Sequence, residues 1–262
     1  MVADTLGDPA EASRYSDAMR QLQGLQKTSK GAPAYSRFIN RRLGRHLAAF
    51  AFAVGRTPNQ VTALSALCSL SAIAVVALVR PSVGMAVVVS LALVVGYALD
   101  SADGQLARLR GGGSLSGEWL DHVIDSIKIT TLHAAVLIAV YRFFGLSAAW
   151  PLLIPIAFAV VASVWFFTVL LTDQLRRQHH KAAGSPVVAT GTRAPLLQSL
   201  LILPLDYGVL CLIFLLLPVP KVFLAAYTLL LVGHVLYLSV ALGKWYRELL
   251  SFDRQHHAVG DA

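Results

Sequence analysis

Long apolar stretches separated by short polar connections make up most of the chain. Six of these stretches, at about 59–79, 83–107, 117–141, 150–172, 196–217 and 220–243, are each close to the roughly 20 residues that span a bilayer. Prolines, which commonly mark the ends of helices, lie at or near several of the boundaries, including Pro81, Pro151, Pro195 and Pro218. The pattern predicts an all-α integral membrane bundle of six transmembrane helices.

An amphipathic segment at 35–56 precedes the first of these stretches. Arg37, Arg41 and Arg45 recur at four-residue steps, while large apolar residues recur at three- and four-residue steps on another face. This pattern is typical of a cytosolic helix that lies in the lipid headgroup layer. The alternative is a solvated helix packed on a core, and the four arginines between residues 35 and 55 argue against a seventh span.

The rest of the chain divides around these helices. We expect a polar cytosolic N-terminal tail at 1–34, with one short helix around 11–27, and a juxtamembrane amphipathic helix at 35–56. Thr57 and Pro58 are typical of a helix start. They open a six-helix domain at 57–245, which a cytosolic C-terminal tail at 246–262 follows.

The composition agrees with a membrane location. Hydrophobic residues make up 56% of the chain and charged residues 14%, against about 25% charged in soluble globular proteins. This excludes a disordered chain and most soluble enzymes. The net charge of +8 does not indicate nucleic acid, because eighteen Lys and Arg residues fall on one side of the predicted membrane and three on the other. Both termini are therefore predicted to be cytosolic, and the Ala-, Val- and Arg-rich composition suggests a bacterial plasma membrane.

Acidic residues are scarce, yet five of the 14 lie between 100 and 125, at the cytosolic ends of the second and third spans. Asp100 and Asp103 share one helix face, as do Asp121 and Asp125 on the next helix. The glycines at 111–113 allow the two helices to fold together, so we expect four carboxylates to face one gap. Such a group repels itself unless cations bind, and oxygen ligands select Mg²⁺, Mn²⁺ or Ca²⁺.

Small residues and one arginine accompany these acids. Gly104, Ala107 and Gly117 leave room for close approach to the backbone, and Arg108 supplies a cation. A metal site with an arginine and an accessible backbone suits a diphosphate. A salt-bridge network around Arg108 is the alternative, but one arginine cannot balance four or five acids.

These residues resemble the signature of the CDP-alcohol phosphotransferase (CDP-alcohol phosphatidyltransferase) family. All eight fixed positions of that motif are matched, by Asp100, Asp103, Gly104, Ala107, Arg108, Gly117, Asp121 and Asp125. Residues 57–62 and 36–41 also resemble the start of the family's first helix and the interfacial helix before it. The resemblance covers roughly residues 35–245.

The resemblance implies an enzyme of phospholipid biosynthesis, in which an acceptor hydroxyl attacks the β-phosphorus of a CDP-linked alcohol and CMP leaves. It implies that two Mg²⁺ or Mn²⁺ ions are held by Asp100, Asp103, Asp121 and Asp125. It further implies that the cytidine nucleotide contacts Gly104, Ala107 and Gly117, with Arg108 positioned by the diphosphate or the carboxylates. Asp100 and Asp103 belong to the same implied CDP-binding site. A homodimer is also implied.

The general base has three candidates. Asp125 is preferred, but a metal-bound carboxylate is a weaker base, so Glu118 and His122 are rivals. The segment 117–126 resembles the corresponding segment of choline and ethanolamine phosphotransferases, where Glu and His stand at these places.

The acceptor site is less clear from the sequence. Lys181 and Arg193 lie on the connection between the fourth and fifth spans and could hold an acceptor phosphate, or could serve only to set topology. Asp206, about eleven residues into the predicted fifth span, could pair with a buried donor or line the acceptor cavity. The donor is either CDP-diacylglycerol with a small polyol-type acceptor, or a CDP-headgroup with a lipid alcohol or inositol phosphate as acceptor.

Two other classes of function are compatible with parts of the pattern. Intramembrane acids also mark the pathways of ion or metal transporters, although here the acids gather at one face. Aromatic prenyltransferase-like enzymes also use aspartate–Mg²⁺ sites in helical bundles, with more spans and different spacing.

Overall fold

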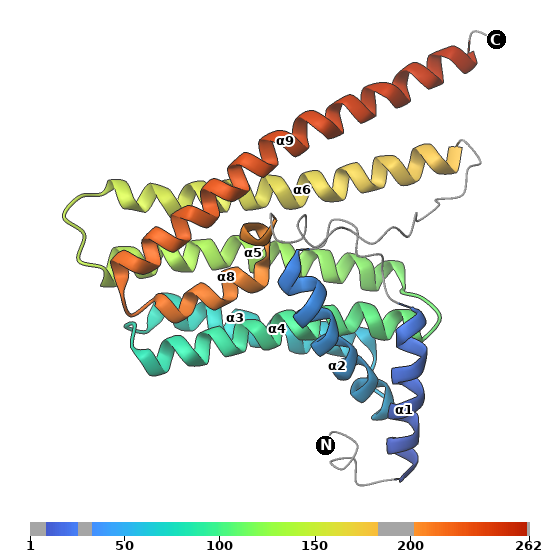
Figure 1. Ribbon diagram of the computed structural model, residues 1–262, viewed down its shortest axis with the longest axis horizontal. Coiled ribbons are helices and arrows are strands. Elements are labelled where there is room, and N and C mark those ends of the chain that lie inside the picture. The colour runs from blue at the N-terminus through green and yellow to red at the C-terminus, as the bar shows by residue number, and fades with distance from the viewer. Residues whose placement is uncertain (1–8, 26–32, 183–201, 261–262) are drawn as a thin grey trace.

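The computed structural model describes residues 9–25, 33–182 and 202–260, and within these ranges it is helical with no strand (Figure 1). The α-helices are α1 (Pro9–Gly24), α2 (Arg41–Ala53), α3 (Pro58–Leu78), α4 (Val83–Leu109), α5 (Leu115–Phe143), α6 (Leu153–Ala182), α8 (Tyr207–Ile213) and α9 (Pro220–Gly260). A π-helical turn at Ser36–Asn40 leads into α2, and short 3₁₀ turns lie at Trp150–Leu152, Leu203–Leu205 and Phe214–Leu216.

Among the described residues, five helical segments are long and apolar enough to cross a membrane, at Pro58–Leu78, Val83–Leu109, Leu115–Phe143, Trp150–Lys181 and Pro220–Arg254. They coincide with five of the six predicted spans, so the all-helical fold is confirmed, and the five apolar helices indicate an integral membrane protein. The predicted span at 196–217 differs, because its described part is not one helix. Leu203–Leu205 forms a 3₁₀ turn, and a separate short apolar helix then begins at Tyr207.

Helices α3 to α6 alternate in direction along the bundle, and α9 runs in the same direction as α6 (Figure 1). The α4–α5 turn and the C-terminal ends of α6 and α9 lie at one end, where α1 is also found. This is the end at which the sequence concentrates its basic residues. The arrangement therefore places the acid-bearing ends of α4 and α5 at the basic end of the bundle.

Capping side chains mark where these helices begin, and glycines form the turn between two of them. Thr57 caps α3 in a reciprocal capping box with Gln60, and Ser82 and Ser114 cap α4 and α5 through their side chains. Between α4 and α5, Gly111 and Gly112 have φ angles of 91° and 128°, a conformation that other residues rarely adopt. The glycine turn therefore returns the chain so that α5 follows α4 with a short connection.

Helices α1 and α2 pack against each other and against α4. Tyr15, Ala18 and Leu22 of α1 are buried in one cluster with Ala48 and other small residues of α2. The opposite face of the 36–53 segment exposes large apolar side chains, those of Phe38, Ile39, Leu43 and Phe50. An exposed apolar face beside arginines is the pattern expected of a helix that lies on a membrane surface.

Gly44 permits the close packing of α2 on α4. A Cβ at this position would lie 2.7 Å from Ser101 Oγ and 2.9 Å from Gln105 Nε2. We expect Gly44→Ala to destabilise the protein by about 1–3 kcal/mol because α2 must move away from α4. Thermal unfolding in detergent measures this. Gly84→Ala on α4 is the matched control, since nothing lies within 4 Å of the added Cβ. Equal melting temperatures for the two variants would contradict the close approach.

Candidate functional site

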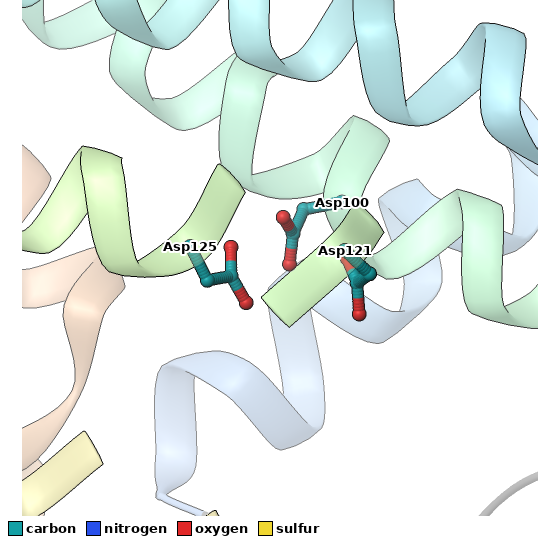
Figure 2. Close-up of side chains that lie close together, drawn as sticks. All are labelled: Asp100, Asp121 and Asp125. Atoms are coloured by element: carbon teal, nitrogen blue, oxygen red, sulfur yellow. The ribbon is translucent and has the colours of Figure 1, made fainter. Parts of the chain in front are cut away.

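Three carboxylates meet where α4 and α5 face each other. Asp100 lies on α4, and Asp121 and Asp125 lie one helical turn apart on α5. One oxygen atom from each of these side chains lies within 4.8 Å of the other two. Figure 2 shows the Asp100 carboxylate between those of Asp121 and Asp125. The predicted juxtaposition of acids from two helices is therefore found for three of the four aspartates.

Asp103 has a different partner from the other three aspartates. Its buried side chain accepts a hydrogen bond of 2.6 Å from the Thr62 hydroxyl of α3, and it does not join the three-carboxylate group. Asp103 and Asp121 nonetheless line the same polar cavity. The expectation that all four carboxylates face one gap is thus met only in part, because α3 provides a competing hydrogen-bond donor.

The geometry of the three carboxylates fits a divalent cation. Oxygens bound to one Mg²⁺ at about 2.1 Å lie at most about 4.2 Å apart, and those around Ca²⁺ at about 2.4 Å lie at most about 4.8 Å apart. The observed separations, within 4.8 Å, enclose a gap of that size. Carboxylate oxygens are the ligands that such hard cations prefer.

Lys128 is a fixed cation at the same place. Its ammonium lies 2.5 Å from Asp100 Oδ1 and 3.3 Å from Asp125 Oδ1, and it donates a hydrogen bond of 3.1 Å to Ser65 Oγ. Lys128 falls within the predicted third span, at about 117–141, and no role was predicted for it. Its signal was present, because a lysine within a membrane segment, three residues after Asp125, is costly unless it is paired.

A polar cavity of about 200 Å³ lies on one side of Asp100. It is lined by Arg41, Asp100, Ser101, Asp103, Gly104, Gln105, Arg108 and Asp121. A Cβ at Gly104 would lie 3.7 Å from the Arg108 guanidinium, so a side chain there would project toward the arginine. Arg108 also donates to the backbone oxygen of Leu25, at the end of the N-terminal segment. Burial lowers the pKa of the Arg41 guanidinium below its usual value.

This cavity contains four of the six residues predicted to bind CDP, namely Asp100, Asp103, Gly104 and Arg108. It adds Arg41, which was predicted only as part of the basic face of the amphipathic segment. Two predicted residues, Ala107 and Gly117, are not among those that line it. A Cβ at Gly117 would instead lie 3.1 Å from Asn59 Oδ1, so this glycine allows α5 to approach the start of α3. The cavity pairs two guanidinium groups with carboxylates, a combination suited to a metal-bound diphosphate.

A second cavity, of about 180 Å³, also has Asp100 in its lining. It is lined by Ser69, Tyr97, Asp100, Asp125, Lys128, Ile129 and Tyr207. The rings of Tyr97 and Tyr207 meet edge to face, with centroids 5.1 Å apart. Asp100 lines both cavities, so the two meet at the carboxylate group.

The three candidates for a general base occupy different surroundings. Asp125 lies in the carboxylate group and lines the second cavity. Glu118 accepts a hydrogen bond of 2.9 Å from Arg177 of α6. His122 Nε2 lies 3.9 Å from Glu118 Oε1, and its ring meets that of Phe166 edge to face. The geometry thus groups Glu118 and His122 with α6 and leaves Asp125 beside the other aspartates.

The residues predicted for the acceptor site do not converge. Lys181 is exposed near the end of α6, and Arg193 lies outside the described residues. Asp206 is buried and caps α8, accepting hydrogen bonds from the backbone N–H groups of Ser36 and Gly208. Burial raises the pKa of Asp206, while these hydrogen bonds oppose the shift. Asp206 therefore joins α8 to the segment before α2, and its neighbour Tyr207, which no sequence signal marked, reaches the second cavity.

The family model described as CDP-alcohol phosphatidyltransferase matches residues 56–245, a region that contains α3, α4, α5 and every residue of the carboxylate group. No curated protein matches the chain.

Proposed function

The chain belongs to the CDP-alcohol phosphatidyltransferase family, and from that premise we propose that it is a divalent-metal-dependent phosphotransferase of phospholipid biosynthesis. The reaction moves a phospho-alcohol from a CDP-linked donor to an acceptor hydroxyl and releases CMP. Membership of this family favours a membrane phosphotransferase over the ion transporter and the prenyltransferase-like enzyme. The observation that carries the proposal is the group formed by Asp100, Asp121 and Asp125, which stand at three fixed positions of the family motif.

The polar cavity is the proposed donor site. Arg41 and Arg108 line it together with the backbone at Gly104, and charge-assisted hydrogen bonds from guanidinium groups suit a diphosphate. Ala107 and Gly117 complete the predicted nucleotide contacts at the end of α4 and the start of α5.

Asp100, Asp103, Asp121 and Asp125 would hold the divalent ions, Mg²⁺ or Mn²⁺, with two expected from the family. When bound, such ions neutralise the charge of the diphosphate and of the departing CMP. Asp125 is the proposed general base and accepts the proton of the acceptor hydroxyl. As the oxygen–phosphorus bond to the acceptor forms, the bond between the β-phosphorus and the CMP oxygen breaks, and CMP retains the electron pair.

The membrane arrangement follows from charge and topology. The basic end of the bundle, which carries the active site, is proposed to face the cytosol of a bacterial plasma membrane. The exposed apolar face of the 36–53 segment is proposed to lie in the headgroup layer of the same leaflet. A homodimer and a phospholipid product remain expectations from the family.

Chelation of divalent metal tests the proposed activity directly. We expect the purified protein with Mg²⁺ or Mn²⁺ to release CMP from CDP-diacylglycerol or from a soluble CDP-alcohol. EDTA should reduce the rate at least about 100-fold because the carboxylates then lack their cations. Excess metal should restore it. Both metals should also raise the melting temperature of the protein. CMP release that is unaffected by EDTA would contradict metal dependence.

A further inference from the structure

The hydroxyl group of Tyr207 is a buried polar group without a partner. Its oxygen is inaccessible to solvent and has no hydrogen-bond partner among the described residues. Folded proteins satisfy most buried polar groups, since leaving one unpaired is unfavourable. An unpaired phenol beside a catalytic group therefore indicates that a bound molecule supplies the missing partner.

The position of Tyr207 identifies what that molecule would approach. The phenol lines the same 180 Å³ cavity as Asp125, the proposed base, and Lys128. Tyr97 fixes the orientation of Tyr207 by packing its ring edge to face against it. The helix that carries Tyr207 is anchored separately, by the hydrogen bond from the Ser36 backbone to Asp206. A group bound in this cavity would thus lie between a positioned phenol and the base.

The charge of the two cavities distinguishes their ligands. The polar cavity contains two arginines, whereas the cavity beside Tyr207 has one cation among its lining residues, Lys128. Lys128 is already paired with Asp100 and Asp125. The other polar groups of this cavity are the hydroxyls of Ser69, Tyr97 and Tyr207. Hydroxyls and an apolar wall suit an uncharged alcohol, but they offer no unpaired cation to a phosphate.

Resting on the proposed function, we infer that this cavity receives the acceptor as an uncharged alcohol, with the Tyr207 phenol as its hydrogen-bond partner. The acceptor oxygen then faces Asp125 on one side and the donor, in the polar cavity, across Asp100. The acceptor O–H proton passes to Asp125, the new oxygen–phosphorus bond forms, and CMP leaves. The uncharged alcohol can be a lipid alcohol such as diacylglycerol or a water-soluble polyol such as glycerol or inositol.

Tyr207→Phe tests the role of the phenol in the full-length protein. CMP release is measured with Mn²⁺ and two donor types, CDP-diacylglycerol with glycerol or inositol, and CDP-ethanolamine with diacylglycerol. We expect the KM of the uncharged acceptor to rise about 3- to 10-fold, the loss of one hydrogen bond, and the KM of the donor to stay within twofold. The melting temperature should be unchanged or higher, because the variant removes an unpaired buried group.

Tyr227→Phe is the matched control. Tyr227 is fully buried, and its hydroxyl is bonded to His133 Nδ1 at 2.5 Å. This variant should lower the melting temperature and leave the acceptor KM unchanged, the opposite pattern to Tyr207→Phe. An acceptor KM unaffected by Tyr207→Phe, with a lower melting temperature, would overturn the assignment and make the phenol purely structural.

Phosphorylated acceptors test the chemical class. In the wild type, glycerol and inositol are compared with glycerol 3-phosphate and inositol 1-phosphate, and diacylglycerol with phosphatidic acid. A higher kcat/KM for the uncharged member of the active pair supports the inference, and activity of a lipid or a polyol pair identifies the source. Preference for the phosphorylated member would overturn it while leaving the proposed reaction standing. No metal-dependent CMP release from any donor would overturn the proposed function and the acceptor assignment with it.

Discussion

Asp125→Asn is expected to reduce turnover by about 10³-fold or more while retaining the donor. The amide has nearly the shape of the carboxylate but neither accepts a proton at neutral pH nor carries a charge toward a metal ion. General base catalysis alone contributes about 10²–10⁴-fold. The donor should still bind because Asp125 does not line the polar cavity that contains Arg41 and Arg108.

Two measurements separate the loss of the chemical step from any loss of donor binding. Single-turnover CMP release reports chemistry, and calorimetric titration of CDP in the presence of Mn²⁺ reports binding, for which we expect a change of at most about fivefold. Glu118→Gln and His122→Asn serve as controls, because these side chains contact each other and elements of α6. Each control variant should keep turnover within about tenfold of the wild-type value. Near-complete activity of Asp125→Asn, with a large loss in either control, would transfer the role of base to that residue.

The carboxylate group was predictable from the sequence because it depends on local geometry. Spacings of three and four residues fix which side chains share a helix face, and a run of glycines allows a short return. These two rules are sufficient to bring Asp100, Asp121 and Asp125 together. They could not reveal the hydrogen bond that Asp103 accepts from Thr62, since that contact depends on how α3 packs against α4.

The segment at 196–217, before α9, shows that hydropathy alone does not predict where a helix is interrupted. Residues 196–217 are apolar enough to resemble a span, so Asp206 was expected deep within a membrane helix. Hydropathy averages over a window and does not register that Pro204 lies in a turn or that Asp206 can cap a new helix. The consequence is functional, because the break that Asp206 makes brings Tyr207 to the cavity beside the carboxylates.

Lys128→Met is expected to destabilise the metal-free protein by about 2–3 kcal/mol. The Lys128 side chain is 6% exposed, and its ammonium contacts Asp100 and Asp125, whose side chains are 23% and 28% exposed. Removal of one partner from a fully buried ion pair costs about 3–5 kcal/mol, and partial exposure of the carboxylates reduces this value. Without the lysine, three neighbouring carboxylates repel one another with no cation between them.

Divalent metal should reverse much of this loss. Because the carboxylates of Lys128→Met lack their internal cation, added Mg²⁺ should raise the melting temperature of the variant more than that of the wild type. Lys128→Arg keeps the charge. The rise in its melting temperature on adding Mg²⁺ should lie between those of Lys128→Met and the wild type, since a planar guanidinium fits the site differently. Lys221→Met, an exposed position at the start of α9, controls for loss of a lysine alone. Equal stability of Lys128→Met and the wild type without metal, with equal Mg²⁺-induced shifts, would show that Lys128 does not neutralise the carboxylates.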